Sequence, residues 1–177
     1  MQFLRKLEEH LAAPKANVNL ELFDKSIVLG DNLEGAITVL PYEDFEAEEI
    51  HCEINCVQDS LVLKTDYDLE AKSLVARQKT ENRVLYQTKT QCSPATALYK
   101  GKKRAFLFSI NIPAGAHATS MSAAELEQWE ITGVIAVHGR PEITTKEQQF
   151  QVVAPNQRSN EPQKASAKNY SQLLEEL

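Results

Sequence analysis

The chain has 177 residues, of which 42% are hydrophobic and 25% charged, and its formal net charge is −6. This length and composition are typical of one globular domain with short tails. The acidic balance argues against a nucleic-acid-binding protein, which usually carries a basic excess to meet the phosphates. No apolar run approaches the roughly 20 residues of a transmembrane helix, and the N-terminus lacks the apolar core of a signal peptide.

Residues 1–15 are predicted to contain a short amphipathic helix. Phe3, Leu7 and Leu11 share one face at helical spacing, and Pro14 blocks continuation of the helix. We expect this face to pack on the domain itself or on a partner. Peripheral contact with a membrane is the weaker alternative, because the segment is short and its charge is mixed.

Period-two alternation of apolar and polar residues predicts three strands, each with one face on a core and the other in water. Gly30 lies in the turn between the first two, and Pro41 ends the second. The acidic run 42–49 is interpreted as a solvated connection, because it lacks the glycine and ligand spacing of a calcium loop. The three predicted strands are residues 18–23, 33–40 and 50–57.

The odd number of cysteines does not suit a disulfide framework. Cys52 and Cys56 share a face of one strand, but four residues separate them by about 13 Å, too far for a disulfide or a shared zinc ion. We predict that they and Cys92 are free thiols in a reducing cytoplasm.

The second half of the chain continues the β pattern. Residues 58–82 are less regular and are interpreted as two short strands, 61–63 and 74–76, around a polar segment. Ser122 and Glu125 have capping-box spacing, which predicts a single helical turn. Trp129 falls on the inward face of its strand. Four further alternating segments are residues 84–92, 106–112, 129–137 and 150–153.

Residues 155–177 are predicted to form a flexible linker and a short C-terminal helix. One face of this helix carries four apolar residues, too few to stabilise it alone in water. The face must therefore dock on this domain, on the N-terminal helix or on another chain, and the last case would produce self-association. The four residues are Tyr170, Leu173, Leu174 and Leu177.

The pattern as a whole predicts an all-β protein. Short strands with glycine and proline between them, and helical patterning at the two ends alone, are typical of a β-sandwich. We therefore expect one antiparallel, immunoglobulin-like β-sandwich over residues 16–154, with short N- and C-terminal helices.

The order of the motifs resembles the N-terminal domain of the arrestin-like fold family. Wider relatives include the bacterial sporulation-control protein and the arrestin-like subunit of the retromer complex. The matching segments are residues 18–22, 30–39, 50–56, 106–113, 129–137 and 150–152.

The resemblance implies a non-enzymatic adaptor or scaffold that binds protein partners through sheet edges and tails, in regulation or trafficking. Two departures limit it. The chain is too short for the second sandwich of arrestins proper, and its first strand carries Asn19 and Glu21 where signalling arrestins have a lysine pair. Receptor binding is therefore not expected.

The chemistry-bearing residues do not form a catalytic motif. The four histidines (His10, His51, His117 and His138) lie outside HxxEH and HxH contexts, and GxSxG, P-loop and GxGxxG motifs are absent. A pair such as Cys92 with His138 would have to meet in space. We expect no enzyme, metal or cofactor. The alternative function is a small-molecule or glycan-binding sandwich, which would require Trp129 and the tyrosines to be exposed around a cleft.

Lys100, Lys102, Lys103 and Arg104 form a concentrated basic patch. One hypothesis is that it binds an anionic partner, such as an acidic tail, a phosphorylated peptide or a lipid head group. The favoured interpretation is a solvated turn whose lysines discourage edge-to-edge aggregation of the next strand.

Overall fold

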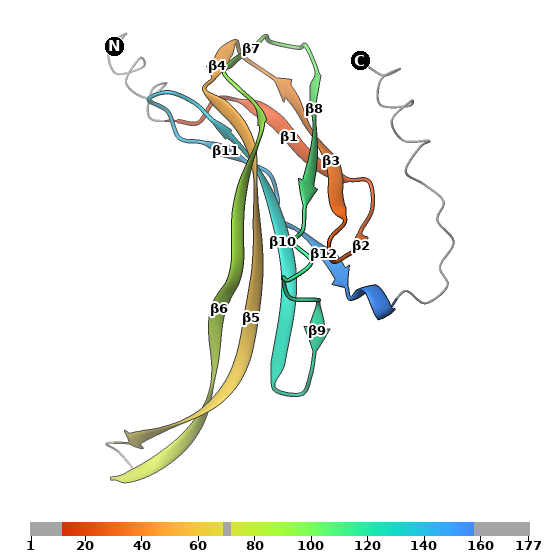
Figure 1. Cartoon of the computed structure of the whole chain (residues 1–177). Helices are drawn as coiled ribbons and strands as arrows, with labels where there is room; N and C mark the ends of the chain where they lie inside the picture. The colour runs from red at the N-terminus through yellow and green to blue at the C-terminus, as the bar shows by residue number, and fades with distance from the viewer. Residues whose placement is uncertain (1–11, 69–71, 158–177) are drawn as a thin grey trace.

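The structure is a computed structural model that describes residues 12–68 and 72–157. Two β-sheets face each other across a common core (Figure 1). The first sheet is antiparallel, with the strand order β1–β3–β8. Its strands are β1 (Ala16–Leu22), β3 (Asn32–Pro41) and β8 (Arg104–Asn111).

The second sheet has the main order β2–β12–β10–β5–β6 and is antiparallel except between β2 and β12. Its strands are β2 (Ser26–Val28), β5 (Glu49–Asp68), β6 (Ser73–Ser93), β10 (Glu125–Ala136) and β12 (Gln148–Val153). Short strands β9 (Ser120–Met121) and β11 (Ile143–Thr144) also pair with β10. A separate pair, β4 (Phe45–Ala47) and β7 (Thr96–Leu98), lies at one end of the sandwich.

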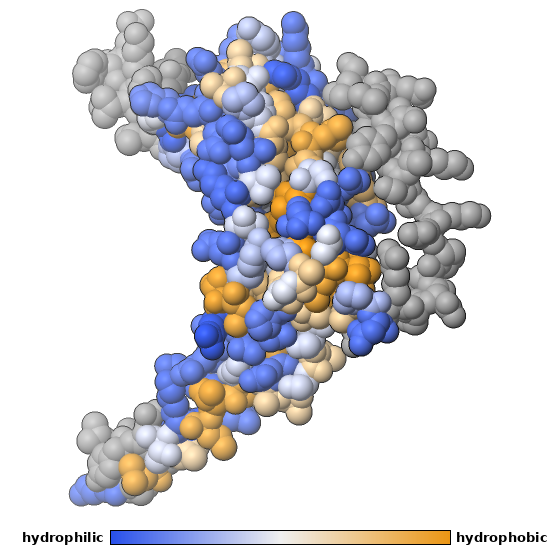
Figure 2. Space-filling model, in the orientation of Figure 1, coloured by the Kyte–Doolittle hydropathy of each residue, from blue (hydrophilic) through white to orange (hydrophobic). Residues whose placement is uncertain are grey.

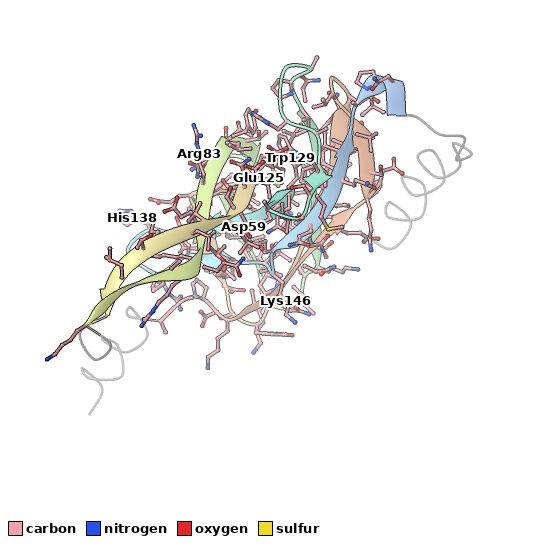
Figure 3. All side chains as sticks on the ribbon, turned by 90° about the horizontal axis from the view of Figure 1, so that it is seen from below. Asp59, Arg83, Glu125, Trp129, His138 and Lys146 are labelled. Atoms are coloured by element: carbon pink, nitrogen blue, oxygen red, sulfur yellow. The ribbon has the colours of Figure 1, made fainter. Side chains whose placement is uncertain are left out.

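The core forms where the inward faces of the two sheets meet. Trp129 on β10 is fully buried, and its ring packs on Tyr86 and Phe150 with centroid distances of 5.4 and 5.8 Å. Its Nε1 donates a hydrogen bond of 2.9 Å to the carbonyl oxygen of His117, so the one polar atom of the indole is satisfied. The predicted inward orientation of Trp129 is confirmed, and Figure 3 shows this residue between the two sheets.

The structure confirms the all-β sandwich and corrects three local predictions. The segments 61–63 and 74–76 are not separate short strands but parts of the long strands β5 and β6. The acidic run contains a strand, β4. Ser122 does not begin a helix: its Oγ accepts hydrogen bonds from the backbone N–H groups of Ala124 and Glu125 in the turn between β9 and β10.

The predicted terminal helices lie largely outside the described residues. This applies to Phe3, Leu7 and Leu11 and to the C-terminal face of Tyr170, Leu173, Leu174 and Leu177, which stay predictions. Residues 12–15, which are described, are not helical, and the described chain ends in a 3-10 turn, η1 (Pro155–Gln157).

Gly35 on β3 permits close approach of the neighbouring strands. A Cβ atom at this position would lie 2.4 Å from the carbonyl oxygen of Glu21 and 2.5 Å from Cζ of Phe108, the cross-strand partner. We expect Gly35→Ala to lower the free energy of unfolding by about 2 kcal/mol, because the backbone must shift to relieve the overlap.

Urea denaturation measures this loss. Gly115→Ala is the matched control, because a Cβ at Gly115 would meet nothing within 4 Å. Equal midpoints for the two variants would contradict the packing argument.

Candidate interaction surfaces

The hairpin formed by β5 and β6 extends beyond the sandwich. β5 pairs with β10 from Glu49 to Ser60, but its pairing with β6 continues to Asp68. Past Ser60, the ladders of the described residues join β5 to β6 alone, and Figure 1 shows this ribbon projecting below the body. A register shift between Cys56 and Val57 marks its base. We call residues 57–68 and 73–84 the arm.

One face of the arm carries exposed apolar side chains. In an antiparallel ladder, alternate residues of one strand and their cross-strand partners share a face. Leu61 and Leu63 therefore share a face with Leu74, the partner of Tyr67, and Val84, the partner of Val57. The exposed fractions of the four side chains are 49% for Leu61, 74% for Leu63, 71% for Leu74 and 53% for Val84. These four residues are the apolar face, and Figure 2 shows apolar side chains on the projecting part.

The opposite face of the arm is charged. Lys64 pairs with Arg77 across the ladder, and its Nζ lies 2.5 Å from Oε1 of Glu81. Lys79 and Arg83 belong to the same face by the register. The two faces of the arm therefore differ in character, although Asp59 and Asn82 also lie on the apolar face and Val62 on the charged one. Neighbouring apolar side chains left in water are a feature of binding surfaces, whereas single ones are common everywhere.

The arm also offers a strand edge. β6 is the last strand in the order of the second sheet, and no strand of the described residues pairs with its outer side. A long free edge can accept an added strand, and charged side chains restrain indiscriminate pairing. Sequence reasoning missed the arm, because it placed two short strands there.

The basic patch forms a tight turn between β7 and β8. Arg104 Nη1 donates hydrogen bonds to Thr96 Oγ1 (3.0 Å) and to the carbonyl oxygen of Ala97 (3.2 Å), and its guanidinium lies 5.1 Å from the Phe106 ring centroid. Lys102 Nζ lies 5.4 Å from the Tyr99 ring centroid. The four basic residues, Lys100, Lys102, Lys103 and Arg104, are exposed.

The hydrogen bonds and the ring contact of Arg104 stabilise this turn. The acidic run also contacts the turn. Asp44 Oδ1 accepts a hydrogen bond of 2.6 Å from the backbone N–H of Lys100. The structure therefore brings an acidic and a basic segment together, which the sequence pattern did not indicate. Anion binding by the patch stays a prediction.

The acidic run is distributed among separate partners. Glu43 binds Arg140 at 2.8 Å, and hydrogen bonds from the backbone of Lys15 and from Arg140 hold the pKa of Glu43 below its usual range. Glu48 lies 2.8 Å from His138, and Glu49 binds Lys89 at 2.8 Å. Within residues 12–68 and 72–157, no cluster of His, Cys, Asp and Glu has the geometry of a metal site.

Cys92 and His138, the example of a pair that would have to meet in space, contact other residues instead. His138 instead contacts Glu48 at the periphery, well away from Trp129 in Figure 3. Cys92 lies beside Cys52, with the two sulfur atoms 3.5 Å apart. Cys52 and Cys92 lie on adjacent strands, so the sequence pattern of either strand alone cannot predict this contact.

Glu130 on β10 is a carboxyl group in a perturbed environment. Burial raises its pKa, and the charge of Glu147 and a hydrogen bond with that carboxyl act in the same direction. Perturbed carboxyls of this kind are a feature of many active sites, but structural charge clusters have them too. Glu130 lies on the side of β10 opposite Trp129, where no catalytic partner was found among the described residues.

The glycan-binding alternative is not favoured by the position of Trp129, because this side chain has no exposed surface. An open groove of about 510 Å³ lies between β1 and β12 and is lined mostly by polar residues such as Asn19, Lys25 and Gln149. It contains no aromatic side chain to stack on a sugar.

The described part of the chain holds no helix with the length and hydrophobicity of a membrane span.

Comparison with known proteins identifies the fold. No family model and no curated protein matches the sequence. Among solved structures, the chain is similar to Spo0M, a sporulation control protein from Bacillus subtilis, with a TM-score of 0.57 and 11% sequence identity. The match covers 79% of this chain and 50% of that chain, so this chain spans about half the length of the solved structure. The chain therefore has an arrestin-like fold, as the order of motifs predicted.

We expect Arg104→Ala to lower the free energy of unfolding by about 1 kcal/mol, because it removes two hydrogen bonds and a cation–π contact from a partly solvated turn. Thermal or urea unfolding measures the change. Lys100→Ala is the control, since its exposed side chain should contribute less than about 0.5 kcal/mol. Equal losses in both variants would contradict the structural role of Arg104.

We expect Glu130→Gln to stabilise the protein at pH 7 by a few tenths of a kcal/mol, the size of an exposed charge pair. A carboxyl whose pKa is raised on folding disfavours the folded state above its unfolded pKa, and this penalty vanishes at pH values below that pKa. The difference from the wild type should therefore disappear near pH 3, as urea titrations at both pH values would show. A Glu130→Gln variant less stable than the wild type at pH 7 would refute the assignment.

Proposed function

We propose that this chain is a non-enzymatic adaptor or scaffold module that binds a protein partner through its arm. The observation that carries the proposal is the apolar face, in which Leu61, Leu63, Leu74 and Val84 are exposed on a ribbon that extends beyond the sandwich. The arrestin-like fold supports it, because members of this fold are generally non-enzymatic.

The energetics of the apolar face favour a binding role over a structural one. A side chain that keeps half or more of its surface in water contributes little to folding. If a partner covered the exposed part, each leucine would contribute about 1–2 kcal/mol, because full burial contributes about 1.5–3 kcal/mol and part of each side chain is already covered. A few such anchors supply much of the affinity of a typical interface, after the entropic cost of association is subtracted.

The free edge of β6 supplies a second element of recognition. A partner strand added there would gain backbone hydrogen bonds, and side chains of the arm would select its sequence. The charged face, with Lys79, Arg83 and the Lys64–Glu81 ion pair, would remain in water or form a polar rim. Such a partner fits a role in regulation or trafficking in the cytoplasm.

Site-specific photocrosslinking in cells tests the proposal. A photoreactive residue is placed at Leu63 on the apolar face, at Lys79 on the charged face and at Leu107, an exposed apolar residue on β8 (43% exposed). We expect position 63 to crosslink a defined partner protein more strongly than the other two positions. Equal labelling from all three positions would contradict binding through the arm.

A paired substitution tests the energetic argument. The double variant Leu61→Ser, Leu63→Ser should reduce partner crosslinking from position 74 at least tenfold, because two anchors are lost. Its own free energy of unfolding should stay within about 1 kcal/mol of the wild type, since both side chains are exposed. Unchanged crosslinking in a folded variant would overturn the proposal, as would crosslinks to a second copy alone.

A further inference from the structure

Cys52 and Cys92 lie together at the end of the β5–β6 ladder opposite the arm. Cys52 is on β5 and is fully buried, whereas Cys92 on β6 is partly exposed. Their Sγ atoms are 3.5 Å apart. The ladder pairs Ile50 with Ser93 and His51 with Gln91, so Cys92 is the extra residue of a β-bulge. A bulged residue is not fixed by cross-strand pairing and can move more easily than its neighbours.

We propose that Cys52 and Cys92 are a redox-active pair that forms an intramolecular disulfide bond, while Cys56 remains a thiol. A disulfide requires the two sulfur atoms to approach to about 2.05 Å, so the gap must close by about 1.5 Å. Rotation of the Cys92 side chain and a small adjustment of the bulge can provide this movement. The proposal does not depend on partner binding by the arm.

The environment assigns different roles to the two thiols. The partly exposed Cys92 is the one that an oxidant in solution can reach, and the contact with Cys52 lowers its pKa, although burial and Glu49 oppose this shift. The same contact and burial raise the pKa of Cys52. Since the thiolate is the nucleophile, Cys92 reacts first and Cys52 second. Burial raises the pKa of Cys56 to about 11, with Glu127 and Glu130 adding to the shift.

A low-molecular-weight disulfide such as oxidised glutathione is the oxidant class that balances the reaction. The Cys92 thiolate attacks one sulfur of the oxidant, forms a mixed disulfide and expels one glutathione thiolate. Cys52 loses its proton as its sulfur attacks Cys92 Sγ, and the second glutathione leaves as a thiolate. The protein gives up two protons and two electrons, and two molecules of reduced glutathione carry them.

The bond would fasten the edge strand β6 to its neighbour β5. It would close a loop between residues 40 positions apart, which contains the whole arm. Cross-linking a loop of this length restricts the unfolded chain, so oxidation should raise the melting temperature by roughly 5–10 °C. The reduced and oxidised forms would differ in how easily β6 separates from the sheet.

The test uses the full chain, first reduced and then incubated with oxidised glutathione. Thiols are counted after denaturation, and cross-linked peptides are identified by mass spectrometry. We expect two of the three thiols to disappear, a peptide linkage between residues 52 and 92, and full reversal by dithiothreitol. Three persistent thiols, a stable glutathione adduct at Cys92 alone, or a linkage to Cys56 would each overturn the proposal.

Three variants test which of the cysteines form the disulfide bond. Cys56→Ala should still lose two thiols, because Cys56 takes no part in the reaction. Cys52→Ala should stop at the glutathione adduct on Cys92, and Cys92→Ser should form neither adduct nor linkage. Circular dichroism confirms that each variant is folded. A Cys52→Ala variant that loses both remaining thiols to a linkage would contradict the pairing of residues 52 and 92.

Discussion

The structure depends on β5, which is hydrogen-bonded on both edges over its first half and on one edge over its second half. From Glu49 to Ser60 it lies between β10 and β6, and its inward side chains Cys52, Ile54 and Cys56 face the first sheet and are fully buried. Beyond Ser60 both the second neighbour and the facing sheet end. Leu61 and Leu63 belong to the opposite face of the strand, the face of Asn55 and Val57, and remain in water. The strand therefore lines the core in its first half and extends into water in its second half.

The length of the β5–β6 ladder has a local cause in the sequence. Residues 42–93 contain neither glycine nor proline, the residues that most often interrupt strands. This absence was the signal that could have predicted the arm, but the polar segment around residues 66–72 was interpreted as a break between short strands. At the end of the hairpin, Lys72 adopts a positive φ of 47°, a conformation that glycine or asparagine more often supplies.

The two features from which the proposals are argued lie at opposite ends of this ladder. The apolar face occupies the projecting end, and the Cys52–Cys92 pair lies near the end where β5 begins and β6 finishes. The likeness to Spo0M, at 11% identity, accounts for the sandwich and does not specify a partner. The function must therefore be argued from these features of the chain's own residues, of which the exposed leucines carry the most weight.

The sequence by itself determined the all-β class, the order of the arrestin-like motifs, the inward position of Trp129 and most strand positions, because period-two alternation is a local property. It did not determine which strands become neighbours or how far the β5–β6 ladder extends past the opposing sheet. Those facts placed Cys92 beside Cys52 rather than His138, joined Asp44 to the basic turn, and left Leu61, Leu63, Leu74 and Val84 in water. Only the tertiary structure decides them, because burial and cross-strand contact depend on segments distant in the chain.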